Sequence, residues 1–188
     1  MEETRGASRV RPRASIGLAL TGLASSLLMM CGVGSAMAGE ETVNAFATWV
    51  GRGGTFQTGP KDMTFVGSLV GRMYAESDKG PVAFGRITCP AMIKVSEDGA
   101  QRGTGHCVIV AGDGAKIYAE LTCAGAFMVG CDGELKITGG SDRIEKVTGQ
   151  GPALVRSDQR IITVQSEVTS TDEATGILYL RGFRYKTP

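Results

Sequence analysis

The sequence predicts an all-β fold, a barrel or sandwich of about eight short antiparallel strands. After residue 38, apolar and polar residues alternate with a period of two, which is typical of half-buried strands. Turn signals rich in glycine and aspartate separate these stretches, and the chain holds 28 glycines. This region shows no helical periodicity long enough to predict a helix of ordinary length.

In the first stretch, Phe65, Leu69 and Met73 share one face and Arg72 lies on the other. The second stretch is expected to be broken or bulged at Pro90, because proline cannot donate a hydrogen bond to the ladder. The expected strands are 63–76, 82–95, 102–111, 115–123, 133–138, 153–156, 160–168 and 177–185, with one helical turn over 141–147 capped by Ser141 or Asp142, and a final turn over 171–176.

Residues 1–38 are predicted to be a cleaved secretory signal helix. Basic residues precede an uncharged, apolar stretch that closes with Ala36-Met37-Ala38, and these are the three parts of such a signal. The alternative is a membrane-spanning anchor, since about 20 apolar residues span a bilayer, but the small-residue ending favours cleavage. We therefore expect a signal at 1–38, a lead segment at 39–60 and a barrel domain at 61–188, in a secreted or periplasmic protein.

The mature chain is close to neutral. The chain has 20 basic and 19 acidic residues, and the signal holds four arginines and two glutamates, which leaves 16 and 17. This balance gives no electrostatic case for binding nucleic acid or, after signal cleavage, a membrane. The chain has a single histidine, His106, which excludes a two-histidine metal site. His106 alternates with Cys107 in the strand pattern, so it is expected on the face exposed to solvent. We expect no metal and no cofactor.

Four cysteines of the mature chain predict two disulfides. An even number in an exported chain is typical of disulfides, and the absence of a Cys-x-x-Cys pair argues against zinc. A hairpin centred midway between them places Cys89 opposite Cys107. Cys123 and Cys131 flank a tight loop centred on Phe127. We predict the bonds Cys89–Cys107 and Cys123–Cys131, on the apolar face that forms the wall of the core.

The segment 123–149 carries a glycine pattern. A strand leads to Gly139 and Gly140, a short irregular segment follows, and Gly149 opens the next strand. This pattern resembles the allene oxide cyclase and dirigent β-barrel superfamily, with Ser141-Asp142 where Thr-Gly is usual, and the strand pattern matches over roughly 63–185.

The resemblance implies an eight-stranded antiparallel barrel of lipocalin-like size with a partly apolar interior, often trimeric in the plant members. Those members cyclise an unsaturated fatty-acid epoxide or steer the coupling of phenolic radicals. None of their catalytic residues is carried over to this chain.

Five polar residues are candidates for orienting a ligand at a barrel mouth: Arg72, Tyr74, Arg86, Tyr179 and Arg181. The alternative for each is a solvated outer face. No catalytic residue is assigned.

Three functions remain open from the sequence. The first is a non-catalytic exported barrel that binds a small apolar ligand in its interior, because eight strands enclose one small ligand or a packed core. The second is a cyclase or isomerase without a cofactor, which would need Glu76, Glu120 or Tyr118 to point inward against their parity. The third is a structural or interaction module, for which the resemblance implies a trimer and which a packed interior would favour.

Overall fold

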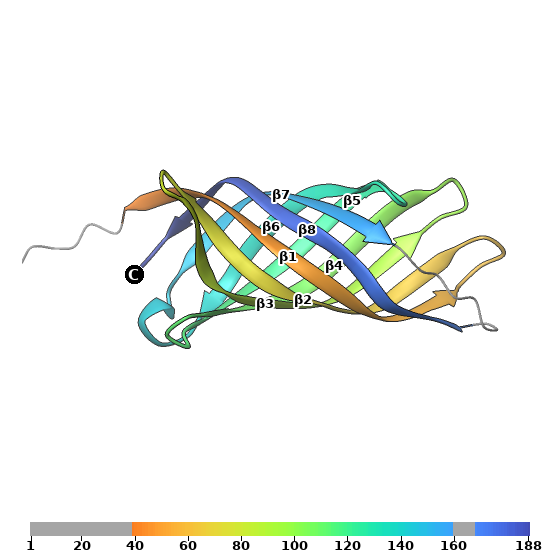
Figure 1. Ribbon diagram of the computed structural model, residues 1–188, viewed down its shortest axis with the longest axis horizontal. Helices are drawn as coiled ribbons and strands as arrows, with labels where there is room; N and C mark the ends of the chain where they lie inside the picture. Colours follow the sequence, from red (N-terminus) through yellow and green to blue (C-terminus); the bar gives the residue numbers. More distant parts are fainter. Residues whose placement is uncertain (1–38, 160–167) are drawn as a thin grey trace, which may run out of the picture. The chain divides into compact units, whose positions relative to one another are not determined.

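The structure, a computed structural model, describes residues 39–159 and 168–188, which form one closed antiparallel β-barrel (Figure 1). Each strand pairs with the next, and β8 pairs with β1 to close the barrel. The strands are β1 (Glu40–Gln57), β2 (Met63–Ser77), β3 (Gly80–Val95), β4 (Ala100–Ala111), β5 (Lys116–Ala126), β6 (Gly130–Gly140), β7 (Thr148–Gln159) and β8 (Val168–Lys186), with the 3₁₀ turn η1 (Asp142–Ile144) before β7. None of the described residues lies in a helix long and apolar enough to cross a membrane.

The predicted fold class is confirmed, and the barrel rather than the sandwich is the right choice. Side chains alternate between the interior and the outer surface, as the period of two requires. The face predicted to be apolar is the inner wall, where Ile87, Ile109, Leu121 and Leu135 are buried. The predicted signal peptide at 1–38 lies outside the described residues.

The placing of the lead segment 39–60 ahead of the barrel domain is wrong. Most of it forms β1, the strand that closes the barrel, so the barrel begins at Glu40 rather than at residue 61. Its Trp49 is buried in the barrel wall, paired with Gly71 of β2 and Gly176 of β8. Glycines at 51, 53 and 54 weaken the strand pattern in the sequence, and pairing on both sides overrides this local preference.

The predicted turn at 171–176 is also wrong, because these residues lie within β8. Their mostly polar composition, closed by Gly176, is typical of a turn, but Ala174 and Gly176 pair with β1 on one side and β7 on the other. The expected strand 153–156 is the middle of β7. Most of the expected strand 160–168 falls on 160–167, outside the described residues.

The prediction of a break or bulge at Pro90 is right only in part, because β3 is continuous and not bulged there but its pairing with β4 is interrupted. Pro90 pairs with Ser68 in an unbroken register with β2, and the pairing with β4 resumes in the same register at Ala91. The pairs between β3 and β4 omit Cys89 and Pro90, so the proline occupies a place where no ladder hydrogen bond is required. The bulge of β3 lies at Phe84 instead.

Both predicted disulfides are confirmed. Cys89 and Cys107 join β3 to β4, with their Cα atoms 4.0 Å apart. Cys123 and Cys131 join β5 to β6, with their Cα atoms 5.4 Å apart. The first pair has the register that hairpin geometry predicts, because the flanking pairs of β3 and β4 are centred on the same turn.

The second bond is diagonal rather than directly cross-strand. The pairing of β5 with β6 is centred on Met128, so Cys123 faces Gly133 and Cys131 faces Gly125. A Cβ at Gly133 would lie 2.8 Å from the Cβ of Cys123, and one at Gly125 would lie 2.9 Å from that of Cys131. Both facing positions therefore require glycine.

The middle of the barrel is filled by side chains. Leu135 and Leu180 are almost fully buried there. The cavity beside Leu69 and Leu121 has a volume of about 10 Å³, room for roughly one water. An eight-stranded barrel is just wide enough for its side chains to fill it, and this one follows that rule in its centre.

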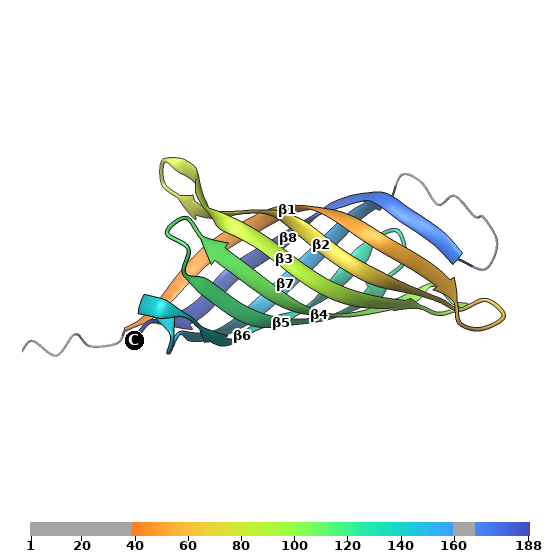
Figure 2. The ribbon, with the colours of Figure 1, turned by 90° about the horizontal axis from the view of Figure 1, so that it is seen from below.

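The two ends of the barrel differ. At the end where β1 begins and β8 finishes, η1 lies across the opening, and Ile144 and Val147 are buried in the core (Figure 2). This confirms the helical turn predicted over 141–147. Ser141 stands at its N-cap position, but its hydroxyl accepts a hydrogen bond from the backbone N–H of Lys116 rather than capping the turn. The opposite end holds the larger of the two internal cavities.

Candidate functional site

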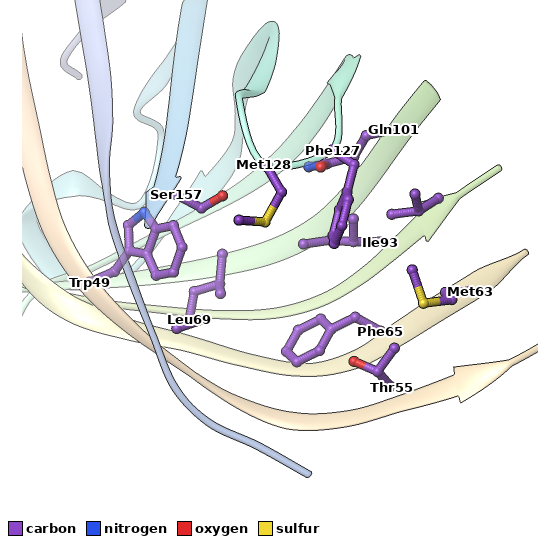
Figure 3. Close-up of a pocket in the computed structure, with 12 residues that line it drawn as sticks. Trp49, Thr55, Met63, Phe65, Leu69, Ile93, Gln101, Phe127, Met128 and Ser157 are labelled. Carbon is purple, nitrogen blue, oxygen red and sulfur yellow. The ribbon is translucent and has the colours of Figure 1, made fainter. Parts of the chain in front are cut away.

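A pocket opens at the barrel end formed by the β1–β2, β3–β4 and β5–β6 turns (Figure 3). We call it the mouth pocket. Its volume is about 50 Å³, and its walls are mostly apolar, with Phe65, Leu69 and Ile93 on one side and Phe127 and Met128 on the other. Ligand pockets for drug-sized molecules hold roughly 300–1,000 Å³, so in this conformation the mouth pocket has room for a few small groups only.

Trp49 forms the inner wall of the mouth pocket. Glycines pair with it on both neighbouring strands, and a Cβ at Gly176 would lie 2.2 Å from the Cζ2 atom of the indole. The ring therefore occupies space that the glycine leaves. Its Nε1–H is buried and has no hydrogen-bond partner among the described residues. A buried donor without a partner costs about 1–3 kcal/mol, so an acceptor that reached it would recover this free energy.

Gln101 provides a further polar group of the mouth pocket. It is 7% exposed, and its side-chain amide has no hydrogen bond within the described part of the chain. The other buried polar residue, Thr64, differs because its hydroxyl lies 3.0 Å from that of Thr58. Figure 3 shows Met128 between Trp49 and Gln101. The hydroxyl-bearing residues Thr55 and Ser157 also line the pocket, so it offers several hydrogen-bonding groups on a mostly apolar wall.

The turn between β5 and β6 covers the mouth pocket. Met128 at its tip is 54% exposed and has a φ of 64°, a left-handed conformation that is unfavourable for a residue other than glycine. One backbone hydrogen bond, from the N–H of Phe127 to the carbonyl of Gly99, ties the turn to the neighbouring β3–β4 turn. Within the turn, the N–H of Val129 donates to the carbonyl of Ala126, and the Cys123–Cys131 disulfide joins the two strands behind it.

The five predicted site residues lie elsewhere. Arg72 and Tyr74 of β2, Arg86 of β3, and Tyr179 and Arg181 of β8 alternate with buried residues and face outward from the barrel wall. The structure brings them to one side of the barrel: Arg72 is in register with Arg86, and the guanidinium carbon of Arg181 lies 5.7 Å from the ring centroid of Tyr179. None of them lines the mouth pocket.

The other polar candidates follow their sequence parity. Glu76, Glu120 and Tyr118 are exposed on the outer surface, so none of these three groups reaches the interior. His106 is exposed as predicted, with its Nδ1 3.9 Å from a carboxylate oxygen of Glu120.

Gln101, Met128 and Trp49 were not predicted as site residues from the sequence. A signal for Gln101 was present, because it has the parity of Cys107 and therefore had to face the core. No local signal marked Trp49, whose environment depends on β8, or Met128, whose position depends on the register of the β5–β6 turn.

The fold and the site together define a small closed β-barrel with disulfide-bonded hairpins, a filled centre and an apolar pocket at one mouth. No protein-family model matches the sequence, and a search of curated proteins found no match. The resemblance to the allene oxide cyclase and dirigent superfamily, and the trimer that it implies, therefore stay predictions.

Proposed function

We propose that this protein is an exported barrel that binds a small, uncharged, mostly apolar molecule at the mouth pocket without catalysis. The observation that carries the proposal is the buried, unpartnered N–H of Trp49 in an apolar wall. An indole only donates, so the ligand needs an acceptor such as a carbonyl oxygen. The two disulfides support an oxidising compartment, in agreement with the predicted signal peptide.

The lining of the pocket restricts the charge of the ligand. Among the described residues, the mouth pocket is lined by no charged side chain. An ion entering it would lose its hydration without gaining a counter-charge, which is costly, so a neutral ligand is favoured. Binding of a ligand that contains a ring requires the turn that carries Phe127 and Met128 to move, because the volume of the mouth pocket, about 50 Å³, is too small for a ring.

A second function, a structural or interaction module with a filled core, is favoured by the packed centre of the barrel. The cyclase or isomerase alternative has less support, because Glu120 and Tyr118 face outward and the mouth pocket holds no carboxylate among its described residues.

The test uses the indole N–H as a reporter. Trp49 is the only tryptophan, so a ¹H–¹⁵N correlation spectrum of the mature, oxidised protein contains one indole signal. Cyclohexanone is added to the protein, and cyclohexane at the same concentration is the control without an acceptor. We expect the ketone to move the indole signal downfield in a saturable manner and the hydrocarbon not to do so.

The matched variants are Gln101→Leu, which removes the buried amide of the mouth pocket, and Gln150→Leu, which makes the same change on the outer surface. We expect the first variant to weaken binding and the second to leave it unchanged. Native mass spectrometry of protein purified from its exporting host adds an unbiased search for a bound molecule. If the indole signal does not move with the ketone and no small molecule co-purifies, the binding proposal is wrong and the interaction module is the better account.

A further inference from the structure

Two arginines face each other on the outer surface, away from the mouth pocket. Arg72 of β2 and Arg86 of β3 are direct cross-strand partners, and both are exposed. Like charges placed opposite each other destabilise a sheet, by up to about 1 kcal/mol. Neither guanidinium contacts a carboxylate in the described part of the chain. By contrast, Arg143 and Arg156 each pair with an aspartate.

The immediate neighbours of this pair along the sheet are uncharged. The row that contains both arginines continues to Thr48 on β1 and Val110 on β4, and Lys116 of β5 follows Val110. The outward-facing row on one side is Phe46, Tyr74 and Ala83, and the row on the other side is Val50, Val70, Thr88 and Val108. No acid of these strands therefore neutralises the two guanidinium groups from a neighbouring position.

Aromatic and apolar side chains lie beside the arginines. Tyr74 stacks on Phe46 with ring centroids 5.2 Å apart, and Val70 is 49% exposed. Phe84 is the unpaired residue of the β3 bulge and is 39% exposed. A Cβ at the next residue, Gly85, would lie 2.1 Å from the carbonyl oxygen of Val110, so the bulged backbone requires glycine there. Bulges commonly redirect a side chain at a functional site, and here one places an aromatic ring beside the charge pair.

The geometry points to a binding site for a small amphiphilic anion, whose acidic group lies between Arg72 and Arg86 and whose apolar body packs on Phe84, Tyr74 and Val70. Adjacent guanidinium groups suit a carboxylate or sulfonate, because each presents two N–H donors in a fixed plane. The bound charge also removes the repulsion between the arginines. This site takes a charged ligand, whereas the mouth pocket takes a neutral one, so each stands or falls separately.

A second like-charge pair supplies a matched control. Lys94 and Arg102 also face each other on the outer surface, across β3 and β4. Their direct neighbours in that row are Thr64 and Ala124, and Phe56 and Asp132 lie one strand further on. If paired cations alone bound the anion, both sites would bind it. If the aromatic neighbours are required, only the Arg72–Arg86 pair binds it.

The experiment measures binding of naphthalene-1-sulfonate to the mature, oxidised protein by isothermal titration calorimetry, with backbone amide shifts locating the site. The neutral naphthalene-1-sulfonamide is the control ligand. We expect the sulfonate to bind with an affinity that falls as salt rises, and the signals around Arg72 and Arg86 to shift. The double variant R72Q/R86Q should bind about tenfold or more weakly, while K94Q/R102Q should bind like the parent protein.

All four substitutions are at exposed positions, and thermal unfolding of each variant checks that the barrel is intact. Equal binding of the neutral sulfonamide, an equal loss in K94Q/R102Q, or no binding of the sulfonate would each overturn the proposal. Binding to anionic phosphatidylglycerol vesicles without binding of the free sulfonate would also overturn it and would identify a membrane-binding surface instead.

Discussion

Removal of the two disulfides is expected to destabilise the barrel unequally. Cys89–Cys107 closes a loop of 18 residues and Cys123–Cys131 a loop of 8. In the chain-entropy treatment, these loops correspond to about 3.2 and about 2.5 kcal/mol at 25 °C. Cys89, Cys107 and Cys131 are each 2% exposed and Cys123 is half-buried, so replacement by alanine leaves two small buried voids at the first bond and one at the second, which adds to each cost. The Cys89→Ala/Cys107→Ala variant should therefore lose about 3–4 kcal/mol and the other double variant about 2–3 kcal/mol.

The assay is equilibrium urea unfolding of the mature protein and the two double-alanine variants, with the fluorescence of Trp49 as the signal. A two-state fit gives the free energy of unfolding in water for each protein. The reasoning fails if loss of the Cys123–Cys131 bond destabilises the barrel more than loss of the Cys89–Cys107 bond. It also fails if removal of either disulfide lowers the free energy of unfolding by less than about 0.5 kcal/mol, because closure of these loops is expected to contribute several times that amount.

Two further predictions concern single residues. Gly176→Ala should shift the fluorescence of Trp49 and lower the free energy of unfolding by more than about 1 kcal/mol, because the added Cβ would lie 2.2 Å from the indole. The control is Gly112→Ala, where nothing lies within 4 Å of the added Cβ, and it should leave the fluorescence unchanged. The hydrogen bond that Tyr185 donates to Glu41, 2.6 Å long, raises the pKa of Tyr185 above 10.0, since ionisation would break the bond and place two negative charges together. Because the pKa of Tyr185 is higher in the folded than in the unfolded protein, the hydrogen bond stabilises the fold fully below pH 10 and this stabilisation is lost as the pH rises through the folded-state pKa. In urea unfolding, the difference in stability between the parent and Tyr185→Phe should therefore disappear at high pH. A difference that persists there would contradict the assignment.

Hairpin geometry was the part of the fold that local sequence could predict. Alternation and turn residues placed β2 to β5 and both disulfides, because a hairpin brings neighbours in sequence together. The β5–β6 turn was predicted to be centred on Phe127, one residue before its true centre at Met128. Because the true centre is Met128, the Cys123–Cys131 bond is diagonal rather than directly cross-strand. The strand β1 was missed for a different reason. Its glycines become compatible with a strand only when β8, more than a hundred residues later, pairs with it.

The mouth pocket was harder to predict than the fold. Parity shows that Gln101 faces inward, but it does not show which inward residues share a level in the barrel. That level depends on the stagger of all eight strands, which no single hairpin determines. For the Arg72–Arg86 site on the outer surface, the sequence indicated the residues but not their arrangement. Arg72 and Arg86 were selected from the sequence as polar residues near a barrel mouth, and only the register of β2 with β3 shows that they are partners.

Three features of the described barrel cost stability, and each lies at a proposed site. The indole N–H of Trp49 is buried without a partner, Met128 has a left-handed backbone, and Arg72 faces Arg86. A like-charge pair is not sufficient evidence, since Lys94 also faces Arg102. Exposed apolar surface does not distinguish the two pairs, because Val66 and Met92 lie beside Lys94. Tyr74 and Phe84, by contrast, are aromatic residues next to the arginines. Sequences commonly break local rules where function requires it, and a ligand that supplied an acceptor or an anion would relieve two of the three costs directly.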